Sequence, residues 1–335
     1  MKLEVDKIYH GFCLTREQRI DEINSTGRIF RHEKSGARLL QLENDDDNKV
    51  FSISFRTPPE DSTGTPHIME HSVLCGSKKF PIKEPFVELV KGSLHTFLNA
   101  MTFPDKTMYP VASRNDKDFF NLIDVYLDAV FYPNITRRVE IFMQEGWHYE
   151  LDSPGGDLDY KGVVYNEMKG AFSTPEAVLF RNIQQSLFPD TCYGVESGGD
   201  PDVIPDLTYE NFLSFHKSFY HPSNSYIFLY GNGNILEQMK FLDEKYLAGF
   251  DSIDVESDIK LQKPFSELNE IHASYPIAED EDEKDKTYLS LNYAVSSSTD
   301  PEMYQAFNIL EYLLLENPAA PLKKALIDAK LGKDV

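Results

Sequence analysis

The chain has few cysteines and few basic residues for its length, and each shortage excludes a class of protein. Its 335 residues include three cysteines, Cys13, Cys75 and Cys192, which are odd in number and far apart. They match neither a disulfide framework nor a Cys-x-x-Cys metal site, so we expect a reducing compartment. Lysine and arginine number 33 against 55 acidic residues, which gives a net charge of −22. That charge argues against nucleic-acid binding and against adhesion to an anionic membrane.

Long apolar runs are also missing. No stretch approaches the 18 residues that would indicate a transmembrane helix, so we expect no membrane span. The first residues, Met1 to Asp6, have no apolar signal core and do not form an Arg/Ser-rich transit peptide. A bacterial cytoplasm fits this N-terminus. An organelle matrix, reached before a targeting segment was lost, is the alternative.

The most informative motif is His67-Ile68-Met69-Glu70-His71, a His-x-x-Glu-His pattern. Pro66 favours the first turn of a helix here, and Gly76 favours its end. On a helix, His67 and His71 share one face and can bind a single Zn²⁺. Glu70 then lies beside the metal and is the candidate base for a metal-bound water. This order is the reverse of His-Glu-x-x-His and is the inverzincin signature.

A zinc bound by two histidines needs a third protein ligand, with one position open for water. Glu167 is our choice, because Val164 and Met168 predict a part-buried helix around it and a buried carboxylate needs a partner. The residues alone leave three competitors open, namely Glu145, Glu150 and Glu176.

The chain shows two regions of similar order. Residues 1–250 mix the period-two patterns typical of strands with helical apolar spacings. Residues 251–266 turn polar and acidic and form the predicted linker. Residues 267–335 again place strands before helices, which predicts the beginning of a second similar unit, truncated after a helix.

Individual elements follow from the same patterns. The predicted strands and hairpins cover residues 37–43, 50–55, 94–111, 147–151, 226–230, 271–277 and 287–295. The predicted helices cover residues 16–24, 66–74, 84–91, 118–131, 138–144, 162–172, 176–188, 209–220, 236–247, 302–315 and 321–330.

Several segments in this order resemble the N-terminal third of an insulinase-type (M16) zinc metallopeptidase, nearest to the presequence protease and falcilysin branch. The matching segments are 64–77, 83–86, 92–94, 97–107, 161–170 and 197–201. The resemblance implies an α+β unit: a mixed, largely antiparallel sheet with helices packed on one face, followed by the start of a second such unit. Residues 1–250 would be the catalytic domain.

The resemblance also implies a zinc-dependent endopeptidase for short unfolded peptides. It assigns His67, His71 and Glu167 to one Zn²⁺ per chain, and Glu70 to the base that takes a proton from the attacking water. Asn99 and Ala100 match the sheet edge along which such enzymes bind peptide as an added strand. The residues alone favour a plain strand or turn for this pair.

In the family, the C-terminal half of the same protein supplies an Arg and a Tyr to the substrate site, so that half is an expected partner. Two other functions remain open. One is a zinc-binding but non-catalytic fragment that needs the other half. The other is a structural subunit, against which the intact His67, Glu70 and His71 argue.

Overall fold

The main element of the first part of the chain is a mixed, mostly antiparallel sheet. The computed structural model describes residues 3–83 and 85–331, in which nine strands pair in the order β1-β2-β3-β4-β11-β5-β8-β6, with β7 also paired to β8. The strands are β1 (Ile8–Tyr9), β2 (Phe12–Ile20), β3 (Ser25–His32), β4 (Arg38–Glu43), β5 (Lys49–Arg56), β6 (His95–Leu98), β7 (Met101–Thr102), β8 (Lys106–Ser113) and β11 (Ser225–Gly231). Among these pairs β11 and β4 run parallel and the others antiparallel. The predicted fold class is confirmed.

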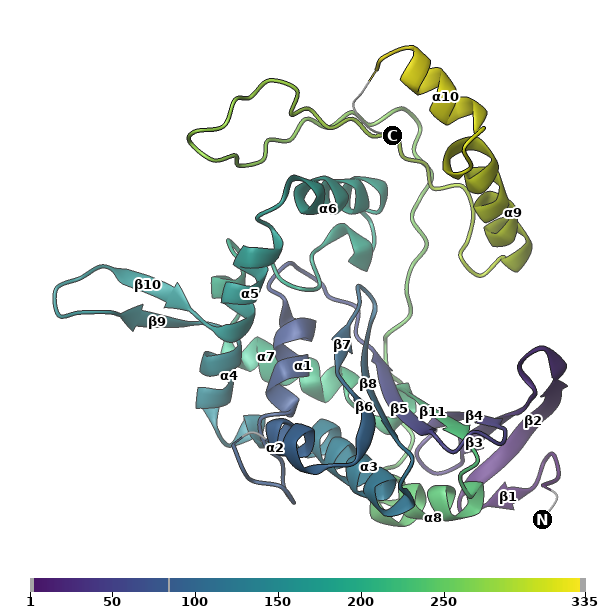
Figure 1. Ribbon diagram of the computed structural model, residues 1–335. Coiled ribbons are helices and arrows are strands. Elements are labelled where there is room, and N and C mark those ends of the chain that lie inside the picture. The colour runs from purple at the N-terminus through teal and green to yellow at the C-terminus, as the bar shows by residue number, and fades with distance from the viewer. Residues whose placement is uncertain (1–2, 84, 332–335) are drawn as a thin grey trace. The chain divides into compact units, whose positions relative to one another are not determined.

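Helices cover one face of this sheet (Figure 1). The helices of the first unit are α1 (Thr65–Val73), α2 (Pro85–Gly92), α3 (Asp116–Phe131), α4 (Val139–Glu145), α5 (Val163–Ala171), α6 (Pro175–Leu187), α7 (Tyr209–Phe219) and α8 (Ile235–Lys245). Strand β11 shows why one face is covered: Ile227 and Leu229 are buried, whereas Tyr226 and Phe228 between them are partly exposed. This alternation is that of a strand with a single buried face.

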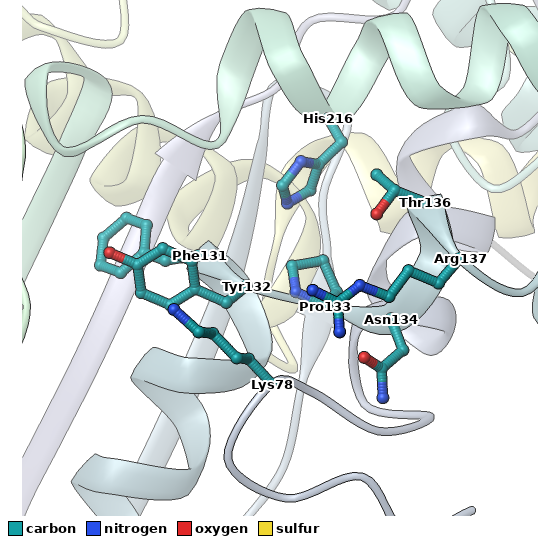
Figure 2. A pocket seen from close by; sticks show the side chains of 8 residues that line it. All are labelled: Lys78, Phe131, Tyr132, Pro133, Asn134, Thr136, Arg137 and His216. Atoms are coloured by element: carbon teal, nitrogen blue, oxygen red, sulfur yellow. The ribbon is translucent and has the colours of Figure 1, made fainter.

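A second, two-stranded sheet projects from the helices as a hairpin, formed by β9 (His148–Leu151) and β10 (Leu158–Lys161) (Figure 1). It connects α4 to α5, so it lies between two helices that contribute to the candidate site. A surface pocket lies elsewhere, where the end of α3, the 3-10 helix η2 (Asn134–Thr136) and α7 meet (Figure 2).

The chain divides into two compact units, 1–285 and 286–335. The second contains α9 (Pro301–Glu311), a π-helical turn (Tyr312–Glu316) and α10 (Pro321–Asp328). Residues 253–262, within the predicted linker, are part of the first unit and hydrogen-bond to its residues 190–224, for example from Ser257 Oγ to Asn224 Oδ1 at 2.7 Å. The boundary at 251–266 stays a prediction.

Two predicted strands, 271–277 and 287–295, are wrong for the described residues, which form no strand there. The side chains alternate in polarity, but neither segment joins a described sheet, and Leu289 is 89% exposed. A strand without a partner leaves its backbone hydrogen bonds to water and has little stability of its own.

The predicted helix at 16–24 is also wrong: these residues belong to β2 and a 3-10 turn (Asp21–Ile23). Glu17 lies directly opposite Arg28 on β3, and their side chains pair at 2.6 Å. Cross-strand pairing therefore outweighs the helix propensity of the charged residues. The start of the helix predicted from Glu84 lies outside the described residues. Within the described ranges, no helix is both long and apolar enough to cross a bilayer.

Candidate metal centre

Helix α1 places His67 and His71 on one face, one turn apart, as predicted. Their ring centroids are 4.9 Å apart. Pro66 lies in the first turn of α1, and the N-cap residue before the helix is Gly64, whose φ of +70° is left-handed. A Cβ at Gly64 would lie 2.6 Å from Gly199 Cα, so this glycine lets the start of α1 approach the 198–199 loop.

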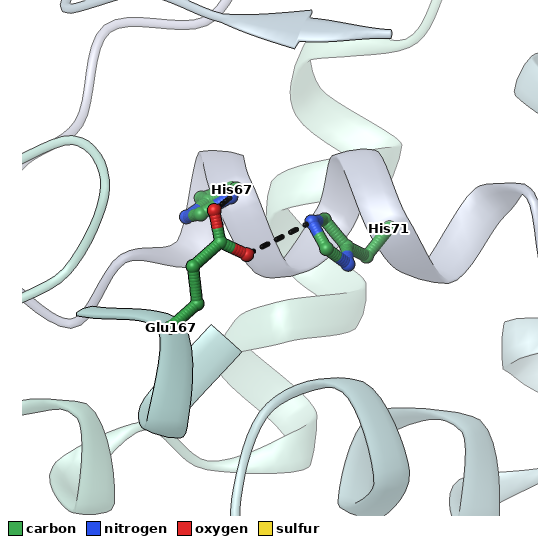
Figure 3. A group of neighbouring side chains, drawn as sticks. All are labelled: His67, His71 and Glu167. Carbon is green, nitrogen blue, oxygen red and sulfur yellow. Dashed lines mark ion pairs between the residues drawn. The ribbon is translucent and has the colours of Figure 1, made fainter. Parts of the chain in front are cut away.

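Helix α5 brings Glu167 to the two imidazoles (Figure 3). Glu167 Oε1 lies 3.8 Å from His67 Nε2, and Oε2 lies 3.7 Å from His71 Nε2. One ligand atom from each residue falls within 4.8 Å of the others, which makes the three residues a group able to bind a metal ion. Gly162 allows this approach, because a Cβ there would collide with the Gly146 carbonyl at the end of α4.

The remaining nitrogens of both histidines have partners away from Glu167. His67 Nδ1 donates to the Gly198 carbonyl at 3.0 Å, and His71 Nδ1 lies 3.3 Å from Glu145 Oε2. Such contacts leave each Nε2 directed at the group and fix the ring orientation, the usual arrangement around metal-bound histidines. Glu145, one of the three competitors for the third ligand, thus contacts a histidine from its outer side.

Glu145 and His71 each shift the pKa of the other. Burial alone would lower the pKa of His71, but its hydrogen bond with Glu145 and the surrounding carboxylates more than offset this, so the pKa is raised. Burial alone would raise the pKa of Glu145, but hydrogen bonds from His71, Gln144 and Cys75 lower it overall. Glu145 is therefore an ionised, 6% exposed carboxylate whose hydrogen bonds are satisfied.

Glu70 is buried beside the group, with 7% exposure. The Thr102 hydroxyl on β7 donates a hydrogen bond to Glu70 Oε2 at 2.6 Å. This bond holds one carboxylate oxygen in place. A general base needs such a fixed orientation in order to meet a water molecule. Sequence reasoning missed Thr102, whose short segment 101–102 showed no signal beyond a strand. It also missed Gly198, although residues 197–201 are among the segments that carry the family resemblance.

The donor set fits Zn²⁺. Two imidazole nitrogens and one carboxylate, with a fourth direction open, are the ligands of catalytic zinc sites. Bonds of about 2 Å in a tetrahedron place ligand atoms about 3.3 Å apart. The ligand atoms of the three residues lie up to 4.8 Å apart, so they need to close by up to about 1.5 Å to bind one ion. The Glu167 side chain, 52% exposed, has room to move toward the histidines.

The exposure of Glu167 differs from what the sequence predicted. Glu167 was chosen as a part-buried carboxylate in need of a partner, but on α5 the buried residues are Val164, Tyr165 and Met168. Its position is set by the face of the helix and not by burial. The other competitors do not join the group: Glu150 lies 3.5 Å from His148 on β9, and Glu176 is in the first turn of α6.

Asn99 and Ala100 connect β6 to β7, next to the terminal strand of the main sheet. The Asn99 amide donates to Pro110, and its carbonyl accepts from the Tyr126 hydroxyl at 3.2 Å. Ala100 packs against the core. Two residues further on is Thr102, so this edge adjoins Glu70. Their role in substrate binding stays a prediction.

Solved structures define the class of this fold. The crystal structure of pitrilysin matches 76% of this chain and 26% of its own, with a TM-score of 0.59 and 17% identity. A protease from Helicobacter pylori matches 69% of this chain and 52% of its own, with a TM-score of 0.51 and 18% identity. These matches concern the fold alone, which is that of the pitrilysin-like peptidases.

Sequence comparison gives the family. Residues 206–335 match the model described as Peptidase M16 inactive domain. Protein HypA of Clostridium perfringens is 59% identical over the whole chain, and Presequence protease 1 of Arabidopsis thaliana is 51% identical over 98% of it. The mitochondrial presequence protease of Xenopus laevis is 42% identical over 97%. The chain belongs to the M16 peptidase family and is homologous to its presequence proteases along its length.

The chain spans about a third of these relatives: 34% of the Clostridium protein, 31% of the Arabidopsis protein and 32% of the Xenopus protein. The matched inactive domain begins at residue 206, after every residue of the candidate metal centre. The centre therefore lies outside the segment to which that description applies.

Proposed function

We propose that this chain is the zinc-binding, catalytic part of a metalloendopeptidase that hydrolyses short unfolded peptides. The observation that carries the proposal is the convergence of His67, His71 and Glu167 within 4.8 Å, with the buried Glu70 beside them. Homology to presequence proteases supports a peptidase, and the fold supports the same class.

Within this proposal each residue has one task. His67, His71 and Glu167 bind one Zn²⁺, which when bound lowers the pKa of a water molecule to about 7 and polarises a carbonyl. Glu70 accepts the proton of the attacking water and returns it to the leaving amine. Thr102 holds the Glu70 carboxylate in position. The edge at Asn99 and Ala100 pairs with the peptide backbone, so affinity would depend little on peptide sequence.

Metal content tests the proposal directly. Protein purified without chelator should contain about one zinc per chain. Removal with a chelator should abolish peptide cleavage, and added Zn²⁺ should restore it. Cleavage is best measured both in this chain and in a chimera where it replaces the matching third of Arabidopsis Presequence protease 1. Zinc-free protein that is fully folded would refute the proposed site. Zinc without cleavage in the chain but with cleavage in the chimera would locate the missing groups in the remaining two thirds.

Glu145 offers a second, graded test. The Glu145→Gln variant should bind zinc about 10–100-fold more weakly, because the neutral amide no longer orients and polarises His71 through Nδ1. Competition with a chromogenic chelator measures this affinity. Glu150→Gln is the matched control, since Glu150 is 46% exposed on β9 and outside the metal group. Equal zinc affinity in both variants would mean that Glu145 does not support His71.

A further inference from the structure

Two dibasic segments, Lys78-Lys79 and Arg137-Arg138, lie side by side although nearly sixty residues separate them. An isolated β-bridge joins Ser77 to Pro133. The Lys78 amide donates to the Tyr132 carbonyl at 3.0 Å, and the Asn134 amide donates to the Gly76 carbonyl at 2.9 Å. The backbone therefore holds the two segments together, in a chain whose overall charge is strongly negative.

Between these segments is a pocket of about 280 Å³ (Figure 2). Its lining residues are Lys78, Phe131, Tyr132, Pro133, Asn134, Thr136, Arg137 and His216. None of them is acidic, although acidic residues outnumber basic ones by 55 to 33 in the sequence. An opening with two cations and no carboxylate attracts anions and repels cations.

The two lining cations differ from their neighbour Lys79. The Lys79 ammonium is paired with Asp124 at 2.7 Å and with the Tyr246 hydroxyl at 2.8 Å. Among residues 3–83 and 85–331, neither Lys78 nor Arg137 forms an ion pair. Both are exposed, so their donors can serve a ligand without first breaking an internal salt bridge.

The rest of the pocket is neutral and partly aromatic. His216 Nε2 donates to the Val130 carbonyl at 2.9 Å, and burial lowers the pKa of His216 to about 4, so the ring adds no charge. Thr136 adds a hydroxyl, whereas the side-chain amide of Asn134 already donates to the Ser77 carbonyl at 3.2 Å. Tyr132 and Phe131 form an apolar wall, and the Lys78 ammonium lies 5.4 Å from the Tyr132 ring centroid.

We propose that this pocket binds a small organic anion whose phosphate or carboxylate group lies between Lys78 and Arg137. Arginine offers a planar fork of donors that matches either group, and lysine adds a mobile point charge. The apolar part of the ligand would contact Tyr132 and Phe131. The volume fits a small molecule and not a folded partner. No lining residue belongs to the metal centre, so the site would be a second ligand site and independent of zinc.

Titration calorimetry of the chain with phenyl phosphate, in zinc-loaded and in zinc-free form, tests the proposal, with inorganic phosphate and benzoate as parallel probes. We expect one saturable site that is present in both forms, whereas binding at the open position of zinc would require the metal. Lys78→Met and Arg137→Met should each weaken it about tenfold, the loss of one charged hydrogen bond, and the double variant should weaken it further. Weaker binding of inorganic phosphate than of phenyl phosphate would assign part of the affinity to the aromatic wall. Comparison with benzoate identifies whether phosphate or carboxylate is preferred.

Arg31→Met is the matched control, because Arg31 is an exposed arginine on β3, outside the pocket lining. It removes the same charge and should leave the affinity unchanged. Melting temperature and zinc content, which should match the wild type in all variants, verify the fold. The proposal would be overturned if the double variant bound the probes as tightly as the wild type, or if Arg31→Met lost as much affinity as Lys78→Met and Arg137→Met. It would also be overturned if no probe showed saturable binding up to about 10 mM. Because the readout is binding, these outcomes do not depend on peptidase activity.

Discussion

A Glu70→Gln variant is expected to lose peptide cleavage by about 10²–10⁴-fold while retaining its zinc. The amide has nearly the shape of the carboxylate and can still accept the hydrogen bond of Thr102, which is 2.6 Å long in the wild type. It cannot take a proton from water at neutral pH. The loss should therefore appear in the chemical step and not in the metal content or in the fold.

The measurement is turnover of an unstructured fluorogenic peptide by the chimera with Arabidopsis Presequence protease 1, alongside zinc analysis of the same samples. Glu237→Gln is the control, because Glu237 is an exposed residue on α8, outside the metal group. An unchanged turnover in Glu70→Gln would remove Glu70 as the base. A loss of zinc together with turnover would instead assign Glu70 a role in the metal site itself.

The parts of the fold that local patterns determine were predictable from the sequence. Helix α1 follows from Pro66, which favours its first turn, and from Gly76, which favours its end, and it places the two histidines as predicted. Strand β11 follows from an apolar run between polar turns. Both signals lie within a few residues, so no distant contact is needed to interpret them.

The wrong predictions concern segments whose secondary structure depends on pairing with a strand elsewhere in the sequence. Residues 16–20 form a strand because β3 pairs with them, and Glu17 meets Arg28, eleven positions away. Residues 287–295 alternate like a strand but form no strand in the described chain. Periodicity shows how polar and apolar side chains alternate along a segment, but it does not show whether another strand is available to pair with that segment.

The metal group shows the same limit. The motif itself predicts that His67 and His71 lie together, but Glu167 is almost a hundred residues away, and burial was the wrong reason to choose it. Its position depends on Gly162 and Gly146 packing α5 against the end of α4. Thr102 and Gly198 reach the site through the sheet and through a loop, and neither residue type indicates such a role by itself.

A Glu167→Ala variant should lose zinc more completely than Glu145→Gln, because it removes a ligand and not the support of one. The zinc affinity should fall by more than the factor of about 10–100 expected for Glu145, which contacts a ligand and not the metal. The fold should be unaffected: Glu167 is 52% exposed, and alanine is the residue that best suits a helix. Glu167 lies 3.8 Å from His67 and 3.7 Å from His71, and the variant leaves both histidines in place on α1.

Zinc affinity measured by chelator competition, with circular dichroism to verify the helix content, makes the comparison. Asn166→Ala is the matched control, since it shortens an exposed neighbour on the same helix. The expected order of affinity is wild type equal to Asn166→Ala, then Glu145→Gln, then Glu167→Ala. If Glu167→Ala retains wild-type affinity, the third ligand is another carboxylate. The double variant Glu145→Ala/Glu167→Ala would then test Glu145, whose 3.3 Å contact is with His71 Nδ1, on the side of the ring away from the group.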